Sequence, residues 1–436
     1  MNPTRPTFSI FILNWNSRSL IEACLNSVYA QTYPAERVEL IDNSSADDSV
    51  AFVRQQFPRT TVRENGGNLG YAAGNNAALR DLSSDVALLL NPDVILSPNF
   101  LAVMAEALAA DPSMGIAGAK LWYPGGEVIQ HSGGYITHPR AIPGHYGIGE
   151  RDEGQHDTPR DVDYVIGAAL AVRRDVLARV GLLDERFFLY YEDVDLCARA
   201  RAAGYRVVYL PEATGIHVES ATTVKGSFSY LWRFHTGRWL YLLKHFPADE
   251  LLEATLSEER VWLGRLDEDE RRAASLAYLT ARRHLPETLW AREREGAGPL
   301  PPAALERMLV ELHTQAGLRP VGAESRTALL AAATLEARPF VSTVPLIGPL
   351  IARFRASWNN VASRWYIQHV IDQQNEFNRL AIAELPERLA AYEREAQIQL
   401  ELLEQQIVER ADLEQRLQEL SAQLAELERR LGEARE

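Results

Sequence analysis

Acidic residues interleaved with aromatic ones make the segment 183–218 the part of this sequence best suited to chemistry. It reads LDERFFLYYEDVDLCARARAAGYRVVYLPEATGIHV and contains the adjacent pair Glu192 and Asp193, with His217 after a later strand-like run. Neighbouring carboxylates among apolar side chains can keep a pKa that suits a general base. Asp193 would also stabilise a helix N-terminus by its charge, so simple helix capping is the structural alternative.

Short polar side chains follow three strand-like runs in the first hundred residues. They occupy 14–16, 42–45 and 91–93. In open α/β sheets ligands bind outside the carboxyl ends of the strands, so these residues are expected at one ligand-binding edge. Ordinary turn and cap chemistry is the alternative for any one of them alone. Asp93 follows the apolar run LLL closely, and its carboxylate could hold a divalent cation against a diphosphate.

A glycine-rich run, ENGGNLGYAAGNN, occupies residues 64–76. Glycines at a helix start let backbone N–H groups approach a phosphate or sugar closely. The chain has neither G-x-G-x-x-G after its first strand nor G-x-x-x-x-G-K-[ST], so dinucleotide and P-loop signals are not met. By itself the run is more typical of a structural turn.

The elements that must position these residues alternate between strand-like and helix-like patterns over residues 7–122. The expected strands are Phe8–Leu13, Val38–Ile41, Thr60–Arg63 and Val86–Leu90. Four helices are expected between and after these strands. The first begins near Ser19 and Glu22, which have capping-box spacing, and the third follows Gly70. The second covers Ala46–Gln56 and the fourth Pro98–Ala110. Such alternation predicts right-handed βαβ units around a mostly parallel, Rossmann-like sheet.

Six motifs in one order resemble family 2 glycosyltransferases of the GT-A fold, close to bacterial rhamnosyltransferase-like members. They cover about residues 7–220 and are FILNWNS (11–17), IDNSSADDS (41–49), NGGNLGYAAGNN (65–76), LLLNPD (88–93), VIGAALAVRR (165–174) and FFLYYEDVDLCARARAAGYRVVYLPEATGIHV (187–218). The resemblance implies an inverting transferase that moves a sugar, with rhamnose suggested by the subtype, from a nucleotide-diphosphate donor to a glycan or lipid-linked hydroxyl.

The resemblance also implies roles for single residues. Asp193 would be the catalytic base, with Glu192 in support and Gly167 on the acceptor side. Asp93 and His217 would hold Mg²⁺ or Mn²⁺, although Asn91-Pro92-Asp93 supplies one carboxylate where the family's D-x-D supplies two. The implied nucleotide-sugar-binding residues are Asn14, Asp42, Asn43, Asn68, Gly70 and Asn91.

Composition excludes several other classes of protein. Over 436 residues the net charge is −14, which argues against a general nucleic-acid binder. Two cysteines cannot build a disulfide framework, so a cytoplasmic compartment is expected. No stretch approaches the roughly 20 apolar residues of a membrane span. Contact with the inner face of the membrane would therefore have to be peripheral.

Glycine usage and charge pattern divide the chain. We expect a transferase domain over 1–224, an amphipathic interface segment over 225–250, an α-helical region over 251–386 and a coiled coil over 387–436. Leucines at alternating steps of four and three from Leu413 to Leu431 predict the coiled coil and a homo-oligomer. The segment 225–246 suits either a membrane surface or packing against the catalytic domain.

Two other functions compete with a transferase. A glycoside hydrolase also uses paired carboxylates, but it would leave the polar strand ends unexplained. A coiled-coil scaffold that carries an inactive glycosyltransferase-like domain is the other alternative, and the intact Asp93, Asp193 and His217 count against it.

Overall fold

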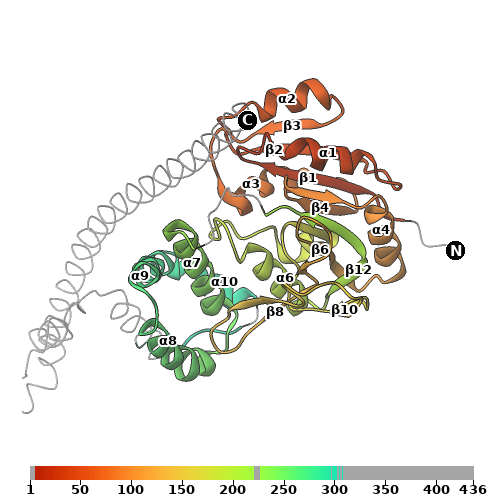
Figure 1. Cartoon of the computed structure of the whole chain (residues 1–436). Helices are drawn as coiled ribbons and strands as arrows, with labels where there is room; N and C mark the ends of the chain where they lie inside the picture. Colours follow the sequence, from red (N-terminus) through yellow and green to blue (C-terminus); the bar gives the residue numbers. More distant parts are fainter. Residues whose placement is uncertain (1–4, 220–225, 296, 302–303, 305–306, 308–436) are drawn as a thin grey trace, which may run out of the picture. The chain divides into compact units, whose positions relative to one another are not determined.

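The computed structural model describes residues 5–219, 226–295, 297–301, 304 and 307, shown in colour in Figure 1. The chain divides into two compact units, Met1–Pro320 and Val321–Glu436. All described residues belong to the first unit. The predicted coiled coil over 387–436 and most of the predicted helical region over 251–386 lie outside the described residues.

A large mixed β-sheet forms the centre of the described unit. Its strands follow the order β10-β12-β6-β11-β4-β1-β2-β3, with β5 added to β12 and β7 added to β6. The strand bounds are β1 Phe8–Asn14, β2 Arg37–Asp42, β3 Thr61–Glu64, β4 Val86–Leu90, β5 Val94–Leu96, β6 Met114–Trp122, β7 Ile129–His131, β10 Arg160–Asp161, β11 Ala169–Arg173 and β12 Arg206–His217. A separate hairpin pairs β8, Gly134–Ile136, with β9, Pro143–His145.

The prediction of an α/β fold is confirmed, whereas the prediction of a mostly parallel sheet is wrong. Strands β1, β2, β3 and β4 pair in parallel, as the βαβ alternation predicted. Strand β11 then inserts antiparallel between β4 and β6, and β5, β7 and β10 also pair antiparallel. The alternation was visible only over residues 7–122, and the antiparallel strand β11 comes later in the chain.

Helices cover both faces of the sheet (Figure 1). Their bounds are α1 Ile21–Tyr29, α2 Ser49–Gln56, α3 Gly70–Leu79, α4 Phe100–Ala110, α5 Arg174–Val180, α6 Glu192–Ala202, α7 Phe228–His245, a π-helical turn η1 Glu250–Thr255, α8 Leu256–Leu263, α9 Glu268–Arg283 and α10 Leu285–Arg294. Because side chains alternate across a strand, Ile10 and Ile12 of β1 pack with α1 and α4, while Phe11 packs on the opposite face. Both faces of the central strands are therefore buried, and β4 is apolar throughout.

Helices α7, α9 and α10 share the hydrophobic core of one sheet face. Trp239, Tyr278 and Leu285 belong to the same buried cluster as Phe11 and Tyr191. The expected division at residue 224 does not coincide with the boundary between the compact units. Of the side chains that suggested a membrane surface, those at Trp232, Trp239, Tyr241, Arg238 and Lys244 are buried. Packing against the catalytic domain is thus the alternative that the structure favours.

Helix starts differ in detail from the sequence expectations. Helix α1 follows Leu20 and has no side-chain cap, so the capping box at Ser19 and Glu22 is wrong. Helix α2 starts at Ser49 rather than Ala46, because Asp47 first accepts a hydrogen bond from the Ser49 backbone N–H at 3.1 Å.

Within the described residues, no helix combines the length and apolarity that crossing a membrane requires.

Candidate active site

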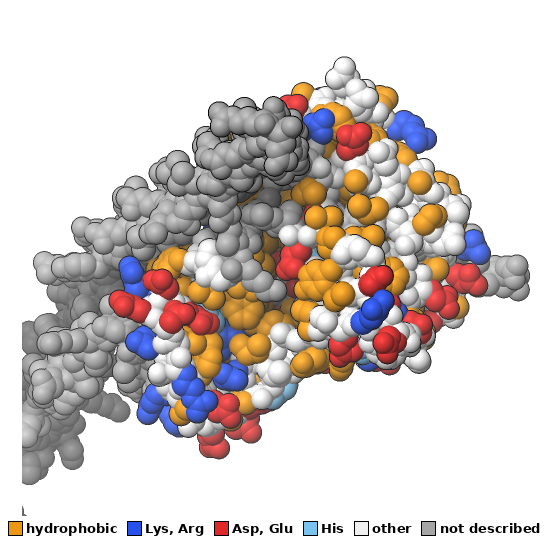
Figure 2. All heavy atoms as spheres, viewed as in Figure 1, with side chains coloured by type: hydrophobic (Ala, Val, Ile, Leu, Met, Phe, Trp, Pro, Cys, Tyr) orange, Lys and Arg blue, Asp and Glu red, His pale blue; other side chains and the backbone are white. Residues whose placement is uncertain are grey.

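The carboxylate pair lies at the first turn of α6. Tyr190 and Tyr191 precede it with left-handed backbones, φ 73° and 70°, and α6 starts at Glu192. This sharp turn brings Glu192 and Asp193 to the helix N-terminus, where negative charge is stabilised by the helix dipole. Figure 2 shows acidic side chains at a hollow of one face of the molecule, flanked by hydrophobic side chains.

Asp193 accepts two backbone hydrogen bonds. Gly167 N–H donates to its Oδ2 at 2.7 Å, and Val194 N–H donates to its Oδ1 at 2.8 Å. Burial raises the pKa of the Asp193 carboxyl above its ordinary value, while these two bonds act in the opposite direction. A carboxylate with a raised pKa that is still held in place is suited to accept a proton.

Glu192 is buried more deeply, at 4% exposure. Burial raises its pKa well above the ordinary value, and the charge of Asp193 raises it further. Within the described part of the chain, Glu192 Oε2 has no hydrogen-bond partner. When two close carboxyls share a site, the better hydrogen-bonded one ionises first. The two backbone hydrogen bonds therefore favour the charged form of Asp193 over that of Glu192.

Asp93 and His217 are brought together by the pairing of β5 with β12. In that antiparallel register His217 lies opposite Val94, and Val218 N–H donates to the Asp93 carbonyl oxygen at 2.9 Å. His217 Nε2 lies 3.3 Å from Asp93 Oδ1. Both side chains are buried, so the structure places this predicted pair where a ligand could be shared.

Gln130 orients the His217 ring. Its Oε1 lies 2.6 Å from His217 Nδ1, and its Nε2 donates to Glu219 Oε2 at 3.4 Å, which assigns the amide. With the amide assigned in this way, Nδ1 of His217 donates to Gln130 Oε1, and Nε2 faces the Asp93 carboxylate. An imidazole nitrogen and a carboxylate oxygen at this distance form a pair that could serve as ligands to a divalent cation such as Mn²⁺ or Mg²⁺.

Asn14 and Asp42 form a polar network at the ends of β1 and β2. The two residues are directly opposite in the parallel register, and Asn14 Nδ2 donates to Asp42 Oδ1 at 2.7 Å. Ser45 donates to the same carboxylate through its backbone N–H at 3.0 Å. Asn14 is fully buried, so it orients Asp42 and does not itself reach the surface.

Asn43 holds the glycine-rich loop. Its Nδ2 donates to the Gly70 carbonyl at 2.9 Å, and Asn65 Nδ2 donates to its Oδ1 at 2.8 Å. Asn68 Oδ1 in turn accepts from Gly70 N–H at 3.0 Å. Gly70 has φ 76°, and a Cβ there would lie 2.3 Å from the Phe188 carbonyl oxygen. The loop therefore needs glycine at this position to contact the segment that leads to Asp193.

The predicted groups meet at one edge of the sheet. Because β4 and β11 pair with Leu90 opposite Ala169, the segment carrying Asp93 adjoins the one carrying Gly167. Asn91 N–H donates to the Ala168 carbonyl at 2.9 Å, directly beside Gly167. Gly167 in turn donates its N–H to the Asp193 carboxylate, so the segments that carry Asp93 and Asp193 lie on either side of Gly167.

Two neighbouring residues were not predicted from the sequence. Tyr71 OH donates to the Gly167 carbonyl at 2.6 Å, and Tyr71 N–H donates to the Phe188 carbonyl at 2.6 Å. Tyr71 thus joins the glycine-rich loop to both sides of Asp193. Gln130 was the other omission, and its place beside a histidine in IQHSGG (129–134) was the available signal.

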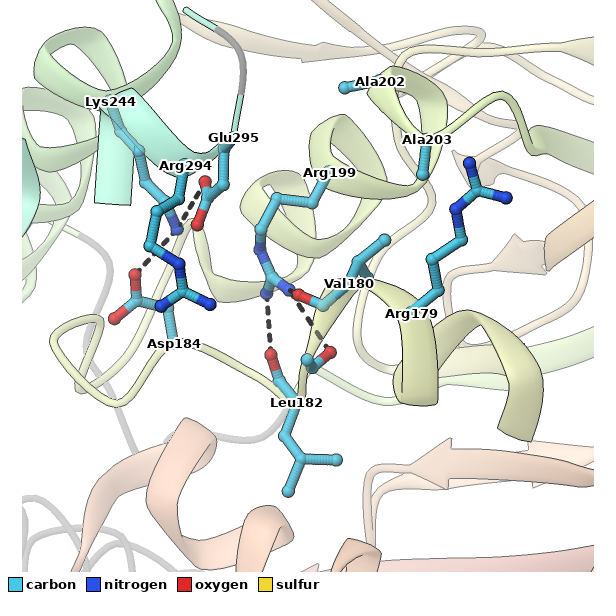
Figure 3. A pocket seen from close by; sticks show the side chains of 11 residues that line it. Arg179, Val180, Leu182, Asp184, Arg199, Ala202, Ala203, Lys244, Arg294 and Glu295 are labelled. Carbon is cyan, nitrogen blue, oxygen red and sulfur yellow. Dashed lines mark hydrogen bonds and ion pairs between the residues drawn. The ribbon is translucent and has the colours of Figure 1, made fainter. Parts of the chain in front are cut away.

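A second acidic cluster lies elsewhere, beside a pocket of about 420 Å³ between α5, α6, α7 and α10 (Figure 3). Asp195, His245 and Glu295 are close enough together to suggest metal ligands. However, Lys244 Nζ lies 2.6 Å from Asp195 Oδ1 and 3.2 Å from Glu295 Oε2. The ammonium already supplies the positive charge, so we interpret the cluster as an ion-pair network.

The comparison with protein families agrees with the site. Residues 5–241 match the family described as "Glycosyltransferase like family 2". This match covers more than half of the chain, and the chain belongs to this family. It is therefore a glycosyltransferase.

Individual relatives share about half of the chain. An N-acetylglucosaminyl-diphospho-decaprenol L-rhamnosyltransferase of Mycobacterium tuberculosis is 29% identical over 246 residues, 51% of this chain and 79% of the relative. O-antigen biosynthesis protein RfbC of Myxococcus xanthus is 31% identical over 234 residues, 50% of this chain but only 18% of RfbC.

Among solved structures, a mannosyltransferase from Pyrobaculum calidifontis in complex with GDP-Man and Mn²⁺ is 19% identical. The alignment covers 76% of this chain and 80% of that one, with a TM-score of 0.39. A TM-score this low supports no conclusion about the present chain.

Proposed function

We propose that this glycosyltransferase inverts the anomeric centre as it moves a sugar from a nucleoside-diphosphate donor to a hydroxyl of a lipid-linked or glycan acceptor. The observation that supports the proposal most strongly is the Asp193 carboxylate, which is held by Gly167 N–H at the same sheet edge as the Asp93–His217 pair. Rhamnose is the proposed sugar, because the rhamnosyltransferase of M. tuberculosis is similar over half of the chain.

In the proposed reaction Asp193 accepts the proton of the acceptor hydroxyl as that oxygen attacks the anomeric carbon from the face opposite the diphosphate. The C–O bond to the diphosphate breaks in the same step, so the configuration inverts. General-base assistance is worth about 10²–10⁴-fold, and positioning supplies much of the remainder. Glu192 keeps its proton, which leaves the single negative charge of the pair on Asp193.

Asp93 and His217 would hold the divalent cation that we propose for this site. Bound there, Mg²⁺ or Mn²⁺ would neutralise charge on the departing diphosphate. Gln130 keeps Nε2 of His217 directed at Asp93, which would let both side chains reach one cation. With Asp42, the residues around Gly70 would form the donor side of the site.

A donor screen tests the proposal. Purified protein is mixed with nucleotide sugars, including dTDP-rhamnose, and release of nucleoside diphosphate is measured with and without a polyprenyl-diphospho-N-acetylglucosamine acceptor. We expect release that depends on one donor and rises with the acceptor. Donor hydrolysis that no acceptor accelerates would contradict transfer. No release from any donor would favour the scaffold alternative.

A further inference from the structure

Gly237 lies in the interior of α7, where glycine is less favourable than alanine. A Cβ at this position would lie 2.7 Å from the Tyr190 carbonyl oxygen and 3.0 Å from Tyr191 Cδ2. Real Cβ atoms do not approach a carbonyl oxygen so closely. Glycine therefore lets the backbone of α7 pack directly against the two tyrosines that precede the carboxylate pair.

Those two tyrosines have the left-handed conformation that side chains other than glycine rarely adopt. Such residues persist only where surrounding structure holds them. Two of the holding contacts come from α7: the Tyr191 ring contacts Phe234 at 5.5 Å, and the Tyr190 ring contacts Tyr230 at 5.1 Å between centroids. Tyr191 OH also donates to the Ala141 carbonyl at 2.8 Å.

Helix α7 is also anchored to the helices that follow it, α8 and α9. Arg238 and Glu259 form a fully buried ion pair between α7 and α8, with an Nη1–Oε2 distance of 2.8 Å. Trp239 packs edge-on against Tyr278 of α9, with ring centroids 5.1 Å apart. An atom added at residue 237 would therefore press on the tyrosine turn from a helix that is anchored to α8 and α9.

We propose that α7, through Gly237, holds Tyr190 and Tyr191 in their left-handed conformation and thereby aims Asp193 at the acceptor hydroxyl. Gly237 is a positioning residue, since it acts through the turn and lies outside the acidic pair. The inference rests on the proposed role of Asp193 as the base. In this proposal α7, which is not part of the sheet, positions the base.

Gly237→Ala tests the inference against a matched control, Gly264→Ala. Gly264 follows α8 with φ −65°, and the nearest atom to an added Cβ is the Val261 carbonyl oxygen at 3.4 Å, so alanine fits there. With the donor identified by the screen, we expect Gly237→Ala to lower kcat by about 10- to 100-fold, because small misplacements of reacting groups cost that much. The donor KM of Gly237→Ala should stay within about twofold of the wild-type value. Both kcat and the donor KM of Gly264→Ala should stay within the same range.

The outcomes separate this inference from the proposed function. If Asp193→Asn inactivates the enzyme but Gly237→Ala keeps the wild-type kcat, the positioning role is overturned and the role of Asp193 as the base is kept. If Gly237→Ala instead raises the donor KM by about 10- to 100-fold and leaves kcat unchanged, the positioning role is also overturned. The substitution would then have altered the donor side of the site. If Asp193→Asn is active, both ideas fail.

A second pair of variants decides the matter if Gly237→Ala does not fold. Tyr190→Gly and Tyr190→Ala both remove the ring, but only glycine adopts φ 73° without strain. We expect kcat of Tyr190→Gly to exceed that of Tyr190→Ala by about 5- to 30-fold, the cost of a left-handed alanine. Equal kcat values would show that the backbone conformation does not matter.

Discussion

Hydrogen bonding, rather than burial alone, distinguishes the two carboxyls of the acidic pair. Glu192 is buried and Asp193 partly buried, and burial raises both pKa values. Only Asp193 receives backbone N–H groups from Gly167 and Val194, and these favour its charged form. The base must be ionised, so kcat should fall as the pH drops through the raised pKa of Asp193. The acid limb of the pH profile should therefore lie above 3.8, the ordinary value for aspartate.

The metal proposal makes its own prediction at Asp93. Asp93→Ala removes the only carboxylate of the Asn91-Pro92-Asp93 motif and leaves His217 as a lone imidazole. We expect the variant to bind the donor more weakly and to lose any acceleration by Mg²⁺ or Mn²⁺ in a metal titration. If EDTA leaves the wild-type rate unchanged, the enzyme does not use a metal at this site.

At the scale of the elements, the sequence was most informative where one strand is apolar throughout. Strand β4 begins and ends where its apolar run predicted, at Val86 and Leu90. The carboxyl ends of β1, β2 and β4 then placed the polar residues correctly at one edge of the sheet. Asp93 and His217 were paired only through family resemblance, because their proximity depends on the antiparallel register of β5 and β12.

Contacts between distant elements could not be predicted in this way. Asn43 was predicted to bind the nucleotide, and its hydrogen bond to the Gly70 carbonyl in the glycine-rich loop was not predicted. The role of Tyr71 depends on a loop meeting a segment more than a hundred residues later, and no local pattern encodes that meeting. The burial of α7 could not be predicted either, because an aromatic and basic helix suits either a membrane surface or a protein core.

The buried ion pair between α7 and α8 predicts a large effect on stability. Glu259 accepts from both Arg238 and the Tyr278 hydroxyl, and both members of the pair are fully buried. Glu259→Gln would leave the guanidinium charge uncompensated, which costs about 3–5 kcal/mol when one partner of a buried pair is removed. Urea denaturation should show this loss. A change below about 1 kcal/mol, the usual limit for exposed pairs, would contradict the burial.

At the scale of the whole molecule, the helices after residue 224 complete the described unit. Trp239 and Tyr278 of these helices share one buried cluster with Phe11 of the sheet and with Tyr191. A chain ending at 224 should therefore lack a cooperative thermal transition, whereas one ending at 320 should unfold cooperatively. Cooperative unfolding of both chains, followed by circular dichroism, would show that the sheet domain folds without α7–α10. Self-association through 387–436 remains a separate prediction.

The central claim is that Asp193 removes the proton of the acceptor, and transfer by Asp193→Asn tests it most directly. Asparagine keeps the shape of the side chain but cannot accept that proton. We expect donor binding close to that of wild type and transfer reduced by at least about 10²-fold, the low end for loss of a general base. Glu192→Gln should lose much less. Near-normal transfer by Asp193→Asn, with transfer abolished in Glu192→Gln, would contradict the account.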